Sequence, residues 1–424
     1  MKRPQEISEC PPALVLTVDP GEGEAHAVLD VNALTISRSL GRRGVPVYRF
    51  HNNASHIDLQ SRYCKHVRCP NLVRAPEAVV QSLLDFANQA SHRPVIFPAG
   101  DHGAEFLANW RDALEPSLAV CVASKECMDT ILDKPRLYDL ARGAGVAAPV
   151  THTPGSLEEM KLVATRAAYP AALRPRSSHH WKRKDVVRAI GSVKAIRAED
   201  PETLIGAYER IAAIVPQVMV QEIVPGPDDL LLTFLGYMDR AGQPLGGCVR
   251  KKLRQSPPGF GYCCLTDTVA DTEVLESALR LLRRLNCHGI VSVEFKRDPR
   301  DGRLKLIEIN PRIARTTGVA IAAGVDLPYI AYQDLVGESP SPCLDCEPGV
   351  RWIHLIDEAL AARELIRSGE LTLRDWMGIF RGKLTFADWA WDDPRPFLIA
   401  SRPIVGRGLR RGIRRIFPQA NSRQ

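Results

Sequence analysis

Continuous apolar segments along this chain predict buried strands, and apolar residues at helical spacing predict helices. Near the start, residues 13–18 predict a strand, residues 32–40 predict a helix that ends at Gly41, and residues 45–50 predict a second strand. This order, with glycine at the helix end, is typical of a parallel α/β sheet. A later strand, 94–101, ends in a Gly–Asp pair, and open α/β sheets bind ligands at such strand ends.

The middle of the chain continues with mixed elements. Residues 129–143 predict a helix or a helix pair, and the helical spacing of apolar residues predicts a further helix over 273–285. Prolines at 340, 342 and 348 indicate a linker, and 351–382 are expected to be mostly helical. Strands are predicted at 169–176, 218–226 and 230–238.

Two further strands, 290–295 and 304–312, flank turn-forming residues at 298–302 and predict a hairpin. Side chains alternate along a strand, so Glu308 and Asn310 share one face, while Glu294 lies on the partner strand. Carboxylate and amide oxygens are ligands for Mg²⁺. The tightest hairpin sets Glu294 opposite Lys305, three residues before Glu308, and the sequence leaves open how the two acids meet. Taken one at a time, each acid also fits a solvated strand face.

Length and composition fit a globular protein of two or three domains: 424 residues, 45% hydrophobic and 25% charged. No apolar run has the roughly 18 to 20 residues that span a bilayer, and the first residues lack the apolar core of a signal peptide. We therefore expect a cytoplasmic location. The odd count of 11 cysteines in such a long chain favours reduced thiols.

The excess positive charge lies at the C-terminus. Residues 401–424 hold seven arginines and no acid, which accounts for the whole net charge of +7. Val405, Leu409, Ile413 and Phe417 recur every four residues, as in a basic amphipathic helix on an anionic membrane surface. Three glycines weaken such a helix, so a disordered or docked tail is the alternative. No binding module accompanies the basic residues, and no nucleic-acid partner is expected.

From about residue 14 to 337, the segments VQEIVPG, CVRKKLRQSPPGFG and VEFKRDPRDGRLKLIEINPR resemble the ATP-grasp superfamily, in its carboxylate–amine ligase-like branch. The resemblance implies an α/β and α+β fold with an N-terminal Rossmann-like (pre-ATP-grasp) domain. It places that domain at 1–125 and the ATP-grasp domain at 126–338, with a small lobe at 126–220 and a large lobe at 221–338. A helical C-terminal extension with the basic tail would occupy 339–424.

For the reacting end of the site, the resemblance implies that Glu294, Glu308 and Asn310 hold Mg²⁺, or Mn²⁺ in its place, on the ATP phosphates. Arg312 would face the transferring phosphoryl group, where a planar cation stabilises developing charge. Lys252 and Arg254 match the triphosphate-binding pair, and strand alternation places them on one face with Arg250. A structural salt bridge for Arg312 and a solvated face for the other cations are the alternatives.

For the nucleotide end, the resemblance implies a set of residues that bind ATP: Lys134, Arg174, Gln221, Glu222, Ile223, Val224, Asp228 and Asp229. Glu222 and the backbone of Ile223 and Val224 would contact the adenine edge, and an aspartate of the pair would bind the ribose. Two features depart from the family. Arg174 stands where a lysine is usual, and the loop 177–182 lacks the glycines of the usual phosphate flap.

The function implied is an ATP-dependent ligase that phosphorylates a small-molecule carboxylate and couples the acyl phosphate to an amine. The two departures favour an alternative, a nucleotide-binding regulatory or scaffolding module that has lost catalysis. A carboxylase or an acylphosphate-forming kinase on the same fold is a third reading, because a fold does not fix the acceptor. The sequence specifies neither the substrates nor the oligomeric state.

Overall fold

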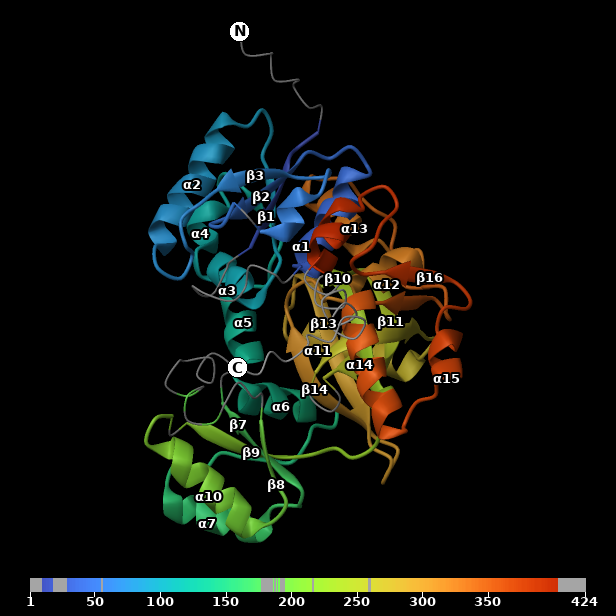
Figure 1. Ribbon diagram of the computed structural model, residues 1–424. Coiled ribbons are helices and arrows are strands. Elements are labelled where there is room, and N and C mark those ends of the chain that lie inside the picture. The colour runs from blue at the N-terminus through green and yellow to red at the C-terminus, as the bar shows by residue number, and fades with distance from the viewer. Residues whose placement is uncertain are drawn as a thin grey trace, which may run out of the picture.

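The computed structural model describes residues 10–402 apart from 18–28, 55, 177–185, 187, 189, 191–194, 216 and 258–260. Strands of this described part form a five-stranded, a four-stranded and a seven-stranded sheet. Figure 1 shows the first at the top, the second at the bottom and the third at the right, with α5 (Lys125–Leu132) and α6 (Lys134–Gly143) between the first two. The sequence predicts a helix or a helix pair for 129–143, and the structure has the pair.

The N-terminal sheet is parallel, with strand order β3-β2-β1-β4-β5. Leu14 and Leu16 pack in one core with α2 (Pro76–Gln89) and α3 (Asp101–Asn109). The short helix α4 (Arg111–Leu114), next in the chain, adds Leu114 to this core. Ala13 and Val15 pack on the other face with α1 (Val31–Gly41) and α13 (Leu327–Leu335). Because α13 comes from the C-terminal half, one core joins this sheet to the seven-stranded sheet. The strands are β1 (Ala13–Leu16), β2 (Val47–His51), β3 (Lys65–Arg68), β4 (Val95–Pro98) and β5 (Ala119–Val120).

The four-stranded sheet is antiparallel, in the order β6-β9-β7-β8. Its two faces differ because side chains alternate along each strand. Leu173 and Val220 pack under helices α7 (Leu157–Arg166) and α10 (Pro201–Ala212), whereas Arg174 and Gln221 line a cavity on the other face. The strands are β6 (Thr151–His152), β7 (Ala171–Pro175), β8 (Ile196–Ala198) and β9 (Val218–Glu222).

The seven-stranded sheet has the order β14-β13-β10-β11-β12-β15-β16. Phe234 and Val293 pack with α11 (Thr272–Arg284) on one face, and Leu235 and Tyr237 pack with α13 near α12 (Thr317–Ala322) on the other. The strands predicted at 230–238 and 290–295 and the helix predicted at 273–285 are confirmed. The strands are β10 (Leu231–Met238), β11 (Pro244–Ser256), β12 (Tyr262–Thr268), β13 (Gly289–Arg297), β14 (Leu304–Asn310), β15 (Arg351–Ile353) and β16 (Leu384–Phe386).

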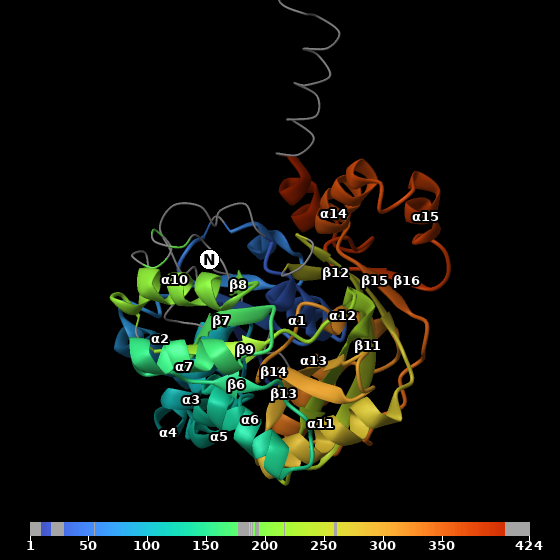
Figure 2. The ribbon, with the colours of Figure 1, turned by 90° about the horizontal axis from the view of Figure 1, so that it is seen from below.

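The C-terminal segment extends this sheet. Helices α14 (Leu355–Ser368) and α15 (Leu373–Gly378) lie beside β12, β15 and β16 in Figure 2. The sequence predicts a mostly helical segment and does not predict its strands β15 and β16. Each has only three residues and is stabilised by pairing with a strand that is distant in the sequence. A buried ion pair, Arg38 Nε to Asp393 Oδ2 at 3.0 Å, joins the segment to α1.

None of the helices in the described ranges is long and apolar enough to cross a membrane. The amphipathic helix predicted for the basic tail falls in residues 403–424, outside the described part of the chain.

Candidate active site

Glu294 and Glu308 lie directly opposite each other on the antiparallel strands β13 and β14. Ser292 is opposite Asn310 in the same register, and the Asn310 Nδ2 donates a hydrogen bond to Glu308 Oε1 at 3.0 Å. Opposite residues of an antiparallel pair project from the same face, so the two carboxylates and the amide gather at one place. The three residues predicted as metal ligands are therefore brought together.

A β-bulge resolves the register offset in the predicted hairpin. The turn sets Lys296 opposite Lys305, and continuing that pairing would put Glu294 opposite Ile307. A register shift between Glu294 and Phe295 leaves Ile307 as an extra, unpaired residue of β14, so Glu308 lies opposite Glu294 instead. Without the bulge, Glu308 would project from the opposite face. Simple alternation with Glu308 predicts that Ile307 points into packing, but this prediction is wrong, since Ile307 lines the cavity.

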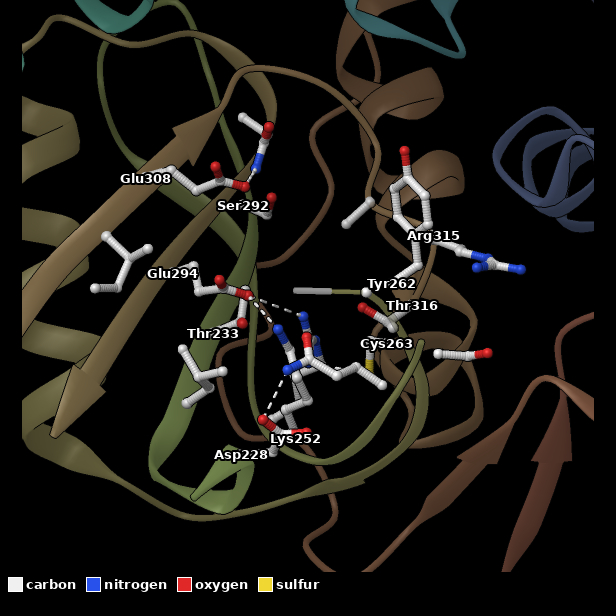
Figure 3. A pocket seen from close by; sticks show the side chains of 18 of the residues that line it. Asp228, Thr233, Lys252, Tyr262, Cys263, Ser292, Glu294, Glu308, Arg315 and Thr316 are labelled. Carbon is white, nitrogen blue, oxygen red and sulfur yellow. Dashed lines mark hydrogen bonds and ion pairs between the residues drawn. The ribbon is translucent and has the colours of Figure 1, made fainter. Parts of the chain in front are cut away.

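Cations from β11 neutralise Glu294. Lys252 Nζ lies 3.4 Å and Arg250 Nη2 lies 3.8 Å from Glu294 Oε2, and both cations are nearly buried. Thr233 on β10 lies between the two strands, opposite Arg250 on one side and Glu294 on the other. Its Oγ1 is buried and has no hydrogen-bond partner within the described residues. Figure 3 shows Glu294 and Lys252 on the same side of the pocket, with Arg315, Tyr262 and Thr316 across it.

Arg254 does not share the face of Arg250 and Lys252, so that prediction is wrong. The pairing of β11 with β12 shifts between Lys252 and Arg254 and again before Gln255. These irregularities turn Gln255 into the cavity and direct Arg254 to the buried carboxylate of Glu358 on α14. Desolvation in this environment raises the pKa of Glu358, although Arg254 opposes the shift. The contact makes Arg254 a structural link to the C-terminal segment.

Lys134 approaches Glu308 from α6, and Arg174 of β7 is close enough to act on Lys134 by its charge. Lys134 Nζ is 3.8 Å from Glu308 Oε2, and Arg174 lines the cavity. Asp133 caps α6 and accepts a hydrogen bond from the backbone N–H of Arg136, which fixes Lys134 in the first turn. Burial and the nearby Arg174 charge lower the pKa of Lys134 to about 8, while Glu308 and Glu294 oppose the shift. An anionic ligand at this position would restore the proton.

We expect binding of MgATP at pH 9 to take up about one proton, and binding at pH 7 to take up almost none, because a pKa near 8 leaves Lys134 largely neutral only at the higher pH. Titration calorimetry in buffers of different ionisation enthalpy measures this uptake. Lys134→Met should abolish it. The control Lys125→Met, which removes the exposed partner of Asp129, should keep it. Equal uptake at both pH values would contradict the assignment.

Glu222 at the end of β9 is held by cations. Its carboxylate lies 3.0 Å from Lys305 Nζ, contacts Arg300, and accepts a hydrogen bond from the Val150 N–H at 3.0 Å. Burial alone would raise the pKa of Glu222, but these three donors outweigh it and lower the pKa. Asp298 completes the cluster at 2.9 Å from Lys305 Nζ. The Glu222 side chain is therefore engaged in a structural clamp between β9 and the hairpin.

Glu222→Gln should lower the melting temperature at pH 7 and the free energy of unfolding by about 1–3 kcal/mol, because Lys305, Arg300 and the Val150 N–H lose a buried charged acceptor. The folded pKa lies below the unfolded value, so the carboxylate stabilises the fold above about pH 4.3, and this contribution is lost as pH falls through the folded pKa. The wild-type and variant melting curves should therefore converge in acid. Glu347→Gln, in an exposed pair with Lys383, should change little at any pH. A pH-independent difference for Glu222→Gln would contradict the account.

The predicted ATP-binding residues that follow β9, called the hinge from here on, divide into lining and non-lining positions. Ile223, Val224 and Asp228 line the cavity, and Asp228 Oδ1 accepts a hydrogen bond from Gln255 Nε2 at 2.7 Å. Burial raises the pKa of Asp228, with Lys252 opposing the shift. Asp229 is exposed and does not line the cavity. Of the two aspartates predicted to bind a ribose, only Asp228 has a suitable position.

Arg312, just past β14, is fixed by the N-terminal sheet. Its Nε donates to Asp101 Oδ1 at 2.5 Å and its Nη1 donates to the Ile313 carbonyl at 2.9 Å. Asp101 begins α3 directly after β4, at the strand end that the sequence marked with a Gly–Asp pair. Burial alone would lower the pKa of Arg312, but Asp101 outweighs it and raises the pKa, so this guanidinium stays charged.

One cavity of about 910 Å³ is lined by Arg250 and by most of the predicted site residues: Glu294, Glu308, Asn310, Arg312, Lys252, Arg174, Gln221, Glu222, Ile223, Val224 and Asp228. Lys134, Arg254 and Asp229 are not among its lining residues. The wall of this cavity also includes residues that no motif of the sequence singled out: Thr316, whose buried Oγ1 has no partner in the described chain, and Asn32 at the start of α1. Arg315 is another, and it pairs with Asp357 of α14 at 2.6 Å. These residues carry no local motif, and only the packing of α1 and α14 onto the sheet brings them together. Further lining residues are Asp30, Ser292, Tyr262, Cys263, His354 and Ile356.

The donor set suits a hard cation and an anionic ligand. Across the described ranges, no group of three or more His, Cys, Asp and Glu side chains is arranged to hold a metal. Glu294, Glu308 and Asn310 offer two carboxylates and an amide, which fits Mg²⁺, an ion that usually keeps several waters and takes further ligands from phosphates. The glycine-free loop at 177–182 and residues 258–260 of the proline-rich loop lie outside the described chain.

Comparison of the sequence with protein families finds a match to "ATP-grasp in the biosynthetic pathway with Ter operon" over residues 249–355. The carbamoyl phosphate synthase large chain of Gemmatimonas aurantiaca is 25% identical over 268 residues, covering 61% of this chain and 23% of the relative. D-aspartate ligase of Enterococcus faecium is 22% identical over 328 residues, covering 73% and 76%. The chain thus spans about a quarter of the first relative and three quarters of the second.

Solved structures share the fold. Biotin carboxylase from Campylobacter jejuni matches with a TM-score of 0.58 at 16% identity, covering 77% of this chain and 71% of that chain. L-amino acid ligase from Bacillus licheniformis matches with a TM-score of 0.56 at 15% identity, covering 77% and 74%. N5-carboxyaminoimidazole ribonucleotide synthetase from Thermus thermophilus matches with a TM-score of 0.56 at 16% identity, covering 80% and 81%.

Proposed function

Since the chain belongs to the ATP-grasp superfamily, we propose that it is an ATP-dependent ligase that joins a small-molecule carboxylate to an amine. The observation that carries this proposal is the meeting of Glu294, Glu308 and Asn310 on one face, with Lys252 and Arg312 at the same cavity. Paired carboxylates surrounded by cations suit metal-assisted phosphoryl transfer. D-aspartate ligase and L-amino acid ligase, two of the similar proteins, are ligases by name.

Residues at the hinge and the small lobe would bind the nucleotide. Ile223 and Val224 line the cavity, where their backbone would contact the adenine edge, and Asp228 suits a ribose hydroxyl. Lys134, Arg174 and Lys252 supply the positive charge that phosphates require. Mg²⁺ or Mn²⁺ held by Glu294, Glu308 and Asn310 would offset the negative charge of the phosphate oxygens. Gln221 lines the cavity, but its amide is already bonded to Arg174.

In the first step, an oxygen of the substrate carboxylate attacks the γ-phosphorus of ATP and the bond to the β,γ-bridging oxygen breaks, which leaves ADP and an acyl phosphate. Arg312 would stabilise the charge on the phosphoryl oxygens in the transition state. In the second step, the amine nitrogen attacks the acyl carbon, phosphate leaves, and the nitrogen loses a proton to form the amide. Closure of the small lobe over the cavity would exclude water, which otherwise hydrolyses the acyl phosphate.

We further propose the domain boundaries 1–125, 126–338 and 339–424, with a Rossmann-like N-terminal domain. The five-stranded parallel sheet supports this reading of the first domain. The contact of Asp101 with Arg312 supports a direct part for that domain in the active site. The strands β15 and β16 support assigning the start of the third segment to the large-lobe sheet.

The alternative function is a nucleotide-binding regulatory module without catalysis. Arg174 in place of the usual lysine favours this alternative, because arginine differs in reach and donor geometry. The intact set of Glu294, Glu308 and Asn310 argues against it. ADP release from MgATP, measured against mixtures of carboxylates and amines, separates the two functions. Release that requires both kinds of substrate supports the ligase, whereas tight MgATP binding without release under every mixture supports the regulatory module.

We also propose that the chain works in the cytoplasm and that its tail contacts anionic membrane surfaces. The support is the sequence of residues 403–424, six of whose residues are arginine and none acidic, an arrangement that favours anionic lipid. The full chain should float with vesicles containing phosphatidylserine but not with neutral vesicles, and a chain ending at Arg402 should float with neither. Equal flotation of both chains on anionic vesicles would contradict the proposal.

A further inference from the structure

A line of three hydrogen bonds, one buried and two half-buried, joins the small lobe to the β-bulge next to Glu308. Arg174 Nη1 donates to Gln221 Oε1 at 2.7 Å, and Gln221 Nε2 donates to the Tyr138 hydroxyl oxygen at 2.8 Å. The Tyr138 hydroxyl in turn donates to the carbonyl of Ile307 at 2.8 Å. These residues come from β7, β9, α6 and β14, so the line crosses from the four-stranded to the seven-stranded sheet.

The chemistry of the end groups fixes the direction of every bond in this line. A guanidinium can only donate, so the Gln221 atom that faces Arg174 must be the carbonyl oxygen. The amide NH₂ of Gln221 then faces Tyr138 and donates to the phenol oxygen. The single phenolic hydrogen is left for the Ile307 carbonyl, which can only accept. Arg174 therefore orients the hydrogen bond that reaches the bulge.

The Ile307 carbonyl belongs to the extra residue of the bulge. A bulge leaves the ladder locally unpaired, and a buried carbonyl without a partner costs about 1–3 kcal/mol. Tyr138 is fully buried, so its hydroxyl supplies this partner from a fixed position. The bulge is also what brings Glu308 opposite Glu294.

We propose that Tyr138 is a positioning residue for metal binding. Its hydroxyl holds the Ile307 bulge and thereby keeps the Glu308 carboxylate on the face of Glu294. Gln221 and Arg174 set the direction of the hydrogen bond that this hydroxyl donates. This inference rests on the proposed binding of MgATP. It also gives a reason for arginine at position 174. A guanidinium has five donors in a planar fork, so one nitrogen can hold Gln221 while others remain directed to the cavity.

The test measures the affinity of the non-hydrolysable analogue AMP-PNP with and without Mg²⁺. The tightening of binding that Mg²⁺ causes is called the metal gain. Tyr138→Phe should reduce the metal gain by about tenfold or more, the usual effect of losing an outer-sphere partner of a metal ligand, and leave metal-free affinity unchanged. Gln221→Glu should also reduce it, because a carboxylate accepts from both neighbours and draws the phenolic hydrogen away from Ile307.

Tyr237→Phe is the matched control. Tyr237 is also fully buried, and its hydroxyl donates to Asp334 Oδ2 at 2.6 Å in another part of the core. This variant should lose stability and keep the full metal gain. A wild-type metal gain in Tyr138→Phe, an equal loss in Tyr237→Phe, or no metal gain in the wild type would overturn the inference. If the wild type shows the gain but never releases ADP, the ligase proposal fails and the role of Tyr138 stands.

Discussion

Replacing Glu308 by glutamine should lower ADP formation by at least about 10³-fold, because loss of metal-assisted charge stabilisation removes several kcal/mol from the transition state. The substitution preserves the size of the side chain and the hydrogen bond with Asn310 but removes the negative charge. The carboxylate also lies near Lys134, so its loss should lower the pKa of Lys134 further. Melting temperature should change little, since Glu308 is partly exposed.

Glu358→Gln provides a matched control for this prediction. Glu358 is a buried carboxylate paired with Arg254 outside the cavity, so this variant should lose stability but keep ADP formation. The pair of variants separates a loss of chemistry from a loss of folding. Full turnover in Glu308→Gln, or an equal loss of turnover in Glu358→Gln with the fold intact, would contradict the site as described.

Replacing Arg312 by methionine should lower kcat by about 10³-fold while the affinity for ATP stays nearly constant. A cation that stabilises charge mainly in the transition state contributes to kcat rather than to ground-state binding. Arg312 is suited to this role because Asp101 and the Ile313 carbonyl hold its guanidinium in place. Single-turnover measurement of ADP formation, with ATP binding measured separately, distinguishes the two effects.

Asp101→Asn tests whether the N-terminal sheet positions this arginine. The amide retains an oxygen acceptor for Arg312 Nε but loses the charge, so kcat should fall by a smaller factor than in Arg312→Met. The ion pair is partly exposed, and its contribution to stability should be small. A loss of ATP affinity without a loss of kcat in Arg312→Met would place Arg312 in substrate binding and refute a transition-state role.

Local patterns predicted the elements that hold the site. The strands around Glu294 and Glu308 have strong alternation and turn signals, and both strands form where expected. Their register could not be read from the sequence, because it depends on a longer turn and on a bulge at Ile307. The bulge is supported by Tyr138, which lies 169 residues away in sequence. Contacts at such separation leave no local trace.

The same limit explains the wrong assignment of Arg254 and the unpredicted partners of Glu222. Alternation placed Arg254 with Lys252, but two irregularities in β11 redirect it to Glu358 on a helix more than 100 residues later. Glu222 lines the cavity as the motif predicts, and its contact with an adenine stays a prediction; the sequence did not show that Lys305 and Arg300 pair with its carboxylate. For both residues, a distant partner of opposite charge determines where the side chain lies.

Trapping the acyl phosphate with hydroxylamine tests the central claim most directly, because it requires the carboxylate but not the natural amine. Purified protein, MgATP and pools of carboxylates are incubated with hydroxylamine, and hydroxamate and ADP are measured together. The ligase account predicts equal amounts of both products from at least one pool, and none of either from Glu308→Gln. Saturable MgATP binding with neither product from any pool would contradict it and favour a regulatory module.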